Sequence, residues 1–328
     1  MLPFDPLQSR REASQEEYRL RSEKLLELRR NHAISADAAI QFQLKKQIAQ
    51  AEAEQDELAK RIDELDRVSE DGQLYLSLLK LGYNKQTLLF RKFVRQYPVA
   101  AFLIYGKLDY GQRWLLNRLV VQHTRDSIAG KVIKINLARV ARRSDVAALW
   151  RELGTRVGLG RQGAIPEIIE RIYQWWRSQN VLLVFYEVDF LPEAFLGELL
   201  RNFWGPLANR AWEMGKPESP YRLLMFLVDY DGRVGDWSIP FAEQLEANWQ
   251  PKMPIKLPAI GEFTESELLH WLQFSSDDLP LQLVEEIDET VEKILENSDN
   301  GVPEPTFGEI CRWAGSDWYE NEDKWMKL

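Results

Sequence analysis

Apolar residues follow two different periods along the chain, one before about residue 98 and one after it. Residues 14–68 contain no Gly or Pro, and their apolar positions recur at the spacing of a helix face. From Val99 onward, short runs of continuous apolar residues alternate with amphipathic stretches. Such runs are typical of parallel strands that are buried on both faces and separated by helices. The sequence therefore predicts an N-terminal helical part followed by an α/β domain.

The N-terminal part is predicted to be an antiparallel helical hairpin. A first helix is expected at about Gln15–His32, and the second carries a heptad seam with steps of four and three. The seam consists of Leu44, Ile48, Ala51, Gln55, Leu58, Ile62 and Leu65. In the connection, Ser35 is expected to cap the second helix and Asp37 to favour its positive end. The second arm is expected to be the longer one, which leaves part of its seam for self-association or another partner.

The second helix is expected to break at Asp71-Gly72, and one further helical stretch is expected at about Leu74–Gln96. Strands are then expected at Val99–Tyr105, Lys131–Leu137, Val181–Val188, Tyr221–Asp229 and Lys252–Leu257. Helices are expected at about Gly111–His123, Asp145–Val157, Ile165–Ser178, Glu193–Arg210, Glu265–Phe274, Leu281–Leu295 and Phe307–Ala314. We therefore expect an α/β fold with a three-layer, parallel-sheet domain at 71–275. The hairpin occupies 1–70, and C-terminal helices with an acidic, aromatic tail occupy 276–328.

Composition narrows the class of protein. The chain has 328 residues, 45% of them hydrophobic and 11% aromatic, which is enough for a large core. The net charge of -9 disfavours nucleic acid as a partner, because such binding depends on Lys and Arg that neutralise phosphates. Cys311 is the single cysteine, so an intrachain disulfide is impossible and a reducing compartment is expected. With neither a signal peptide nor a run of about 18 apolar residues, we expect a cytoplasmic protein that does not bind membranes.

The first predicted strand leads into a phosphate-loop motif that lacks two functional residues. Gly106 and Gly111 have the spacing of the nucleotide-binding sequence G-x-x-x-x-G-K-[S/T]. Gln112 stands where the lysine should reach the phosphates, and Arg113 where a small hydroxyl should hold Mg²⁺. Loss of the lysine removes a charge-assisted hydrogen bond of about 1.5–3 kcal/mol, and a guanidinium cannot ligate a cation. We therefore expect the two glycines to serve a tight strand-to-helix turn.

The predicted strand at 181–188 resembles a Walker B strand, which ends in an acid that holds Mg²⁺ through water. Depending on register, the position of that acid falls on Tyr186, Glu187 or Asp189. Without the lysine and the hydroxyl of the phosphate loop, such an acid does not complete a site for Mg²⁺ and a nucleotide. The structural alternative is that Asp189 caps the helix after Pro192 or lies at the strand end.

Other catalytic and metal-binding arrangements are not expected. His32, His123 and His270 lie in separate elements and lack metal-ligand spacing. Cys311 has no neighbouring histidine, and the sequence contains no Gly-x-Ser-x-Gly elbow. We therefore expect no catalytic residue, no metal and no cofactor.

Several segments resemble the inactive STAND domains of bacterial and cyanobacterial conflict systems, which are relatives of signal-transducing P-loop ATPases with an eroded P-loop. The resemblance covers about residues 20–275. Its segments are Leu78–Gln86 with Phe90 and Phe93, Ala101–Gly106, Gly111–Leu119, Ile255–Pro258 and Trp271-Leu272. It implies a non-catalytic scaffold or sensor-adaptor that links an invader-sensing input to partner proteins, such as an AAA-type ATPase or a protease effector on another chain.

Three functions are open at this point. The first is an interaction scaffold, distinguished by Gln112-Arg113. The second is a divergent ATPase switch that would use Lys107 or Arg113 with Glu187 or Asp189. The third is a nucleic-acid adaptor that would use the basic cluster Arg139, Arg142 and Arg143, against which the acidic net charge argues.

Overall fold

The computed structural model describes residues 6–34, 37–68, 70–124, 128, 130–141, 146–160, 163–215, 220–246 and 248–328. The chain divides into two compact units. The first consists of Met1–Lys80 with Phe274–Leu281, and the second of Leu81–Gln273 with Gln282–Leu328. The domain boundaries expected near residues 70 and 275 stay predictions.

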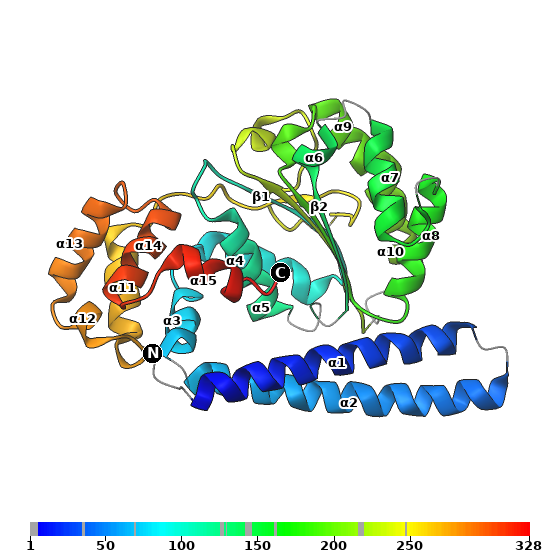
Figure 1. Ribbon diagram of the computed structural model, residues 1–328. Helices are drawn as coiled ribbons and strands as arrows, with labels where there is room; N and C mark the ends of the chain where they lie inside the picture. Colours follow the sequence, from blue (N-terminus) through cyan, green and yellow to red (C-terminus); the bar gives the residue numbers. More distant parts are fainter. Residues whose placement is uncertain are drawn as a thin grey trace. The chain divides into compact units, whose positions relative to one another are not determined.

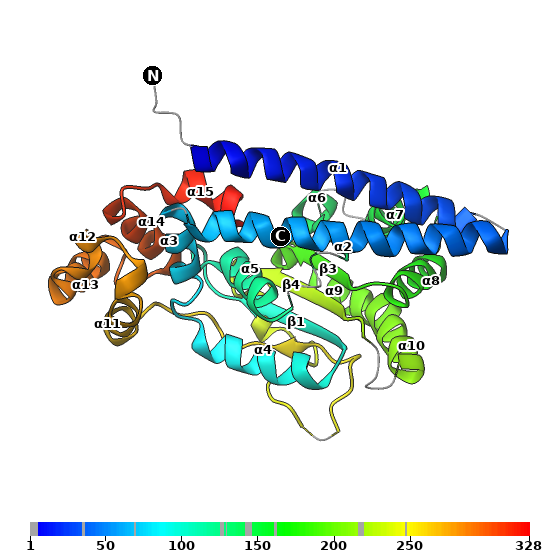
Figure 2. The same cartoon turned by 90° about the horizontal axis from the view of Figure 1, so that it is seen from below.

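The first unit is built on an antiparallel helical hairpin. Its helices are α1 (Pro6–Ile34) and α2 (Ala38–Val68), which lie side by side in both views (Figures 1 and 2). They contain 29 and 31 residues, so the second arm is the longer one, as predicted, by two residues. The difference in length is small because α1 begins at Pro6, before the expected Gln15, and proline is compatible with the first turn of a helix.

Contacts between α1 and α2 fix the register of the hairpin. Gln55, the polar residue of the seam, donates a hydrogen bond to Ser22 Oγ at 2.7 Å. Asp37 accepts a hydrogen bond from the N–H of Ala39 at 2.8 Å and thereby caps α2, whereas Ser35 lies outside the described residues. In this hairpin the seam of α2 faces α1, and Leu58 is buried there.

Two helix boundaries after the hairpin differ from the prediction. α3 (Glu70–Leu78) includes Asp71-Gly72, so the helix does not break at this pair. The stretch expected at 74–96 is two helices, because Gly82 and Tyr83 have φ values of 62° and 53° and α4 (Asn84–Gln96) begins after them. Left-handed residues of this kind end a helix. Glycine is also needed at 82 because a Cβ atom would lie 2.2 Å from the Phe263 ring.

The second unit contains a five-stranded parallel sheet with the strand order β2-β3-β4-β1-β5. The strands are β1 (Val99–Tyr105), β2 (Lys131–Asn136), β3 (Val181–Tyr186), β4 (Leu223–Asp229) and β5 (Ile255–Lys256). The predicted α/β fold is thus confirmed, and β1 has the predicted bounds. β3 ends earlier than predicted because Glu187 has a φ of 58°, which leaves the strand conformation. β5 is shorter because Pro254 has no N–H for the ladder and Met253 closes a turn with Gln250.

Helices cover both faces of the sheet and make the three layers that the sequence predicts (Figure 2). α4 and α5 (Gln112–His123) pack on one face, where the rings of Phe90 and Phe102 lie 4.8 Å apart. α7 (Val146–Arg156), α8 (Ile165–Trp176) and α10 (Gly205–Gly215) contact the other face. Shorter elements connect these layers: α6 (Leu137–Ala141), η3 (Val188–Phe190), α9 (Glu193–Leu199), the π-helical turn η4 (Leu200–Trp204) and η5 (Arg233–Asp236).

Helices follow the sheet to the end of the chain. They are α11 (Glu265–Phe274), η6 (Ser276–Asp278), α12 (Leu281–Val284), α13 (Ile287–Asn297), α14 (Pro303–Trp313) and α15 (Trp318–Trp325). The single helix expected at 281–295 is therefore two, and α15 is a helix that the prediction missed. The tail packs on its own unit, because Trp318 contacts the rings of Phe307 and Trp114. Among the described residues, no helix combines the length and the hydrophobicity of a transmembrane span.

Candidate functional site

The eroded phosphate loop connects β1, an inner strand of the sheet, to α5. Gly111 caps α5 with a φ of 70°. A Cβ atom at this position would lie 2.4 Å from the hydroxyl of Tyr83, which donates a hydrogen bond to the carbonyl of Tyr110 at 3.1 Å. Glycine is thus required at 111 both by the backbone conformation and by the close approach of a tyrosine.

Gln112 is fully buried, and its side chain folds back into the loop. Its Nε2 donates hydrogen bonds to the carbonyls of Gly106 and Lys107, both at 2.8 Å. A glutamine amide has two N–H donors, so none is left for a phosphate. The other amide atom, Oε1, is a buried acceptor without a partner among the described residues, and it would repel an anion.

Arg113 forms ion pairs with the C-terminal helix α15. Its Nη2 lies 3.0 Å from Asp323 Oδ1, and its Nη1 lies 3.4 Å from Glu322 Oε1, both carboxylates of α15. Burial on its own would lower the pKa of Arg113, but the hydrogen bond to Asp323 and the charge of Glu322 raise it above its ordinary value. The side chain that replaces the Mg²⁺-binding hydroxyl therefore serves as an anchor for α15.

The anion position at the start of α5 is held by a carboxylate of the chain itself. Glu304, in the first turn of α14, accepts a hydrogen bond from the N–H of Gly111. Its own N–H donates to the carbonyl of Asp109 at 3.0 Å. Burial, with the nearby charges of Glu322 and Asp109, raises the pKa of Glu304 to about 7. A helix N-terminus ordinarily attracts phosphate, and here this acid occupies the position.

The Walker B-like acids hold the protein backbone. Asp189 is buried in η3, and its Oδ1 accepts a hydrogen bond from the N–H of Tyr230 at 3.1 Å. It does not cap the following helix, because the capping position of α9 is Pro192 and lacks a side-chain hydrogen bond. Asp189 also lies beyond the end of β3, in η3, so it has neither of the two structural roles that the sequence predicts. Glu187 has a left-handed backbone conformation and stands at the N-cap position of η3, where its side chain makes no capping hydrogen bond.

Asp229, at the end of β4, also accepts hydrogen bonds from the protein backbone. Its two oxygens accept hydrogen bonds from the N–H groups of Asp231, Gly232 and Val234 at 2.8–2.9 Å. Burial raises the pKa of Asp229, and these backbone donors counteract part of that rise. Among the described residues, no three His, Cys, Asp or Glu side chains form a group that could hold a metal ion.

The four predicted loop residues lie together in the structure because they are close in the sequence: Gly106, Gly111, Gln112 and Arg113. It adds three acids that sequence reasoning missed: Glu304, Glu322 and Asp323. The one signal for them was the mixture of acids and tryptophans near the C-terminus. Of the basic cluster, Arg139 lies in α6, whereas Arg142 and Arg143 lie outside the described residues.

Comparison with protein families gives a match, and it covers the part of the chain that contains the phosphate loop. Residues 78–228, which include β1 to β3, the loop and nearly all of β4, match the family model iSTAND, described as inactive STAND. This segment is an inactive STAND domain. A comparison with curated proteins gave no significant match.

Solved structures similar to the chain include two archaeal proteins. The Orc1 protein of Aeropyrum pernix, solved in complex with DNA, is 16% identical with a TM-score of 0.34, and the match covers 73% of this chain and 58% of that one. Cdc6p of Pyrobaculum aerophilum is 13% identical with a TM-score of 0.42, and the match covers 75% of this chain and 64% of that one. The chain therefore spans less than two thirds of either protein, and the inactive STAND domain is the part assigned to a family.

Proposed function

We propose that the protein is a non-catalytic scaffold or adaptor that binds other proteins and does not use ATP. One observation supports the proposal above the others: groups of the protein already occupy the phosphate loop. Gln112 has no free donor, and Glu304 takes the N–H of Gly111. Arg113 is paired with α15. A triphosphate would have to displace all three interactions and would meet the negative charge of the acids.

The competing function is a divergent ATPase switch. Lys107 is the cation left for it in the loop, and its Nζ lies over the ring of Tyr110, 5.7 Å from the centroid. The acid it requires would be Glu187 or Asp189. Asp189 holds the backbone of Tyr230, so this structural role accounts for it without catalysis.

Titration calorimetry with ATP and Mg²⁺ tests the proposal. We expect no binding tighter than about 1 mM, which corresponds to roughly -4 kcal/mol. In a phosphate-release assay, Glu187→Ala and Asp189→Ala are expected to give the same flat trace as the wild type. Micromolar binding of ATP, or a turnover that either substitution abolishes, would establish the ATPase instead.

The hairpin is proposed as a second contact element of the scaffold, through self-association on its outer surface. Leu26 and Phe42 are both 63% exposed, although the seam between α1 and α2 is closed. We expect sedimentation equilibrium to show a dimer, and Leu26→Glu with Phe42→Glu to shift it to monomer without loss of helicity. Gln47→Glu, at an exposed polar site of α2, is the matched control. A wild-type monomer at all concentrations would contradict this role.

The biological setting is part of the proposal. We infer a cytoplasmic component of a prokaryotic conflict or signalling system, whose partners include an AAA-type ATPase or a protease effector. The support is the membership of residues 78–228 in the inactive STAND family and the resemblance described above. Identification of the proteins that copurify with the tagged chain would test it.

A further inference from the structure

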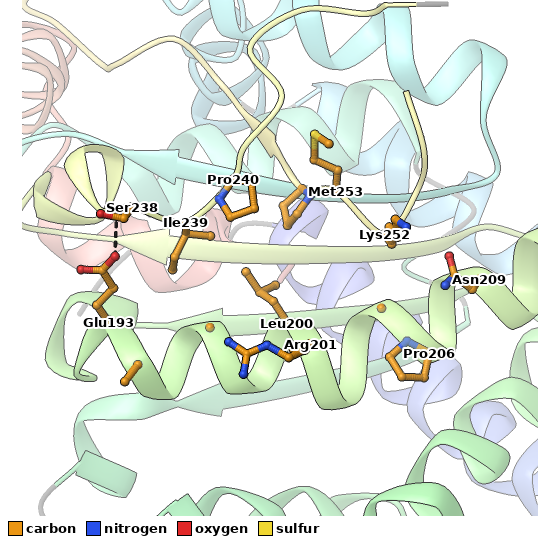
Figure 3. Close-up of a pocket in the computed structure, with 14 residues that line it drawn as sticks. Glu193, Leu200, Arg201, Pro206, Asn209, Ser238, Ile239, Pro240, Lys252 and Met253 are labelled. Atoms are coloured by element: carbon orange, nitrogen blue, oxygen red, sulfur yellow. Dashed lines mark hydrogen bonds between the residues drawn. The ribbon is translucent and has the colours of Figure 1, made fainter. Parts of the chain in front are cut away.

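A groove of about 1150 Å³ lies in the second unit, and no residue of the phosphate loop lines it (Figure 3). One wall is the continuous helix formed by α9, η4 and α10, and the other consists of residues 238–240 and 252–254. Figure 3 shows Glu193 and Ser238 at one end of the groove and Asn209 and Lys252 toward the other. The groove is therefore elongated and follows the helix axis.

The groove exists because of two local features. Parallel strands are usually joined by a helix, but the described residues between β4 and β5 contain only the short turn η5. The facing helix also has small residues, Ala194, Gly197 and Gly205, along the groove. A Cβ atom on Gly197 would come no closer than 3.8 Å to another group, the Nη2 of Arg201. Space that a larger side chain would fill is thus open.

Hydrogen bonds fix the two walls at a set separation. Glu193 Oε1 accepts a hydrogen bond from the N–H of Ser238 at 2.6 Å. The buried Trp204 donates through Nε1 to the carbonyl of Pro251 at 2.9 Å. The next part of the segment is held by Trp249, whose ring lies 4.9 Å from that of Phe93. The groove is consequently preformed, which lowers the entropic cost of binding.

Charge and hydrophobicity along the groove favour one kind of ligand. Leu200, Ile239 and Met253 give it an apolar lining. Arg201 and Lys252 stand on opposite walls, and neither has an ion-pair partner among the described residues. Glu193 lies at one end of the groove, where its carboxylate accepts the N–H of Ser238, so the lining carries two positive side chains and one negative side chain in a chain of net charge -9.

We propose that this groove binds an extended peptide segment of a partner protein, in which apolar side chains are flanked by Asp or Glu. The apolar side chains lie on the lining, and the acids pair with Arg201 and Lys252. A peptide fits better than a small molecule because pockets for small molecules have volumes of about 300–1,000 Å³ and enclose most of the ligand. The proposal stands independently of the phosphate loop and holds even if ATP binds there.

Selection from a phage-displayed library of random linear peptides tests the proposal, with the full-length protein as the target. We expect enrichment of sequences that place Asp or Glu beside Leu, Ile, Met or Phe. A fluorescein-labelled synthetic copy of one enriched peptide is then titrated by fluorescence anisotropy. We expect Gly197→Leu, which fills the groove, and Arg201→Glu each to weaken its binding by about tenfold or more.

The matched control is Gly308→Leu in α14, where a Cβ atom meets nothing within 4 Å. Both substitutions replace a helical glycine by a better helix former, so neither is expected to harm folding. Gly308→Leu should bind the peptide as the wild type does. Failure to enrich any peptide, enriched sequences without acids, or equal binding to Gly197→Leu would each overturn the proposal. A change of oligomeric state with Gly197→Leu would also overturn it, because the occupant would then be a second copy of the chain.

Discussion

Replacement of Trp318 by alanine is expected to lower the free energy of unfolding by about 3–5 kcal/mol, the usual range for a large aromatic residue in a core. Trp318 is only 1% exposed. Its ring stacks on Phe307 at 4.7 Å and meets Trp114 edge to face at 5.1 Å. Aromatic pairs of this kind contribute about 0.5–1.5 kcal/mol beyond the burial of their surface. The substitution removes both contacts and leaves a cavity between α5, α14 and α15.

Urea denaturation followed by circular dichroism measures this loss, because fluorescence itself changes when a tryptophan is removed. The neighbouring Tyr319→Ala is the control, since Tyr319 is 68% exposed and its removal should change stability by less than about 0.5 kcal/mol. A loss below about 1 kcal/mol for Trp318→Ala would mean that the tail does not pack on α5 in solution.

The contribution of Glu304 to stability is expected to fall as the pH rises from about 5 to about 8, and Glu304→Gln is expected to remove that contribution. The pKa of Glu304 is raised from 4.5 to about 7 in the folded protein, first by burial and then by the charges of Glu322 and Asp109. Between these two values the folded state holds more protons than the unfolded state. The contribution of Glu304 to the free energy of unfolding therefore decreases with pH through this window and levels off above it. Allowing for solvent screening at the partly exposed carboxylate, Glu304 accounts for about 2 kcal/mol.

Denaturation of wild type and Glu304→Gln at several pH values isolates this contribution. The amide oxygen that the substitution introduces can still accept the hydrogen bond from Gly111, and it carries no charge. We expect the variant to match the wild type near pH 5 and to exceed its stability by about 2 kcal/mol near pH 8. Glu320→Gln, an exposed site of α15, should leave the wild-type profile unchanged. Parallel profiles for wild type and Glu304→Gln would show that the carboxylate is solvated.

The apolar patterns were sufficient to predict the order of the five strands and of the main helices that cover the sheet, but they missed α15. β1 has the predicted bounds because Val99–Tyr105 is buried on both faces and reads as one apolar run. The misplaced boundaries lie where backbone conformation, not hydrophobicity, ends an element. Glu187 stops β3, and Gly82 with Tyr83 splits the expected helix, each through a positive φ that nothing in the local pattern announces for Glu or Tyr.

The candidate site was predictable only in part, for a related reason. Gly106, Gly111, Gln112 and Arg113 lie within eight residues of one another, so comparison with the P-loop motif was enough to identify the missing lysine and hydroxyl. Glu304 and the pair Glu322 and Asp323 lie about two hundred residues away, and their approach to the loop depends on how α14 and α15 pack. Acids near a C-terminus ordinarily face solvent, and no spacing rule distinguishes those that fold back.

The way in which Arg113 is tied to α15 also bears on whether the ancestral chemistry could ever return. Putting Lys and Ser back at 112 and 113 would leave Glu322 and Asp323 without their cation and Glu304 still seated in the loop. Each step of a reversal would thus be harmful until the others were made, in segments encoded far apart. Under the proposed function, a nucleotide site in this loop would therefore require changes in three separate segments of the chain, and no single substitution would create it.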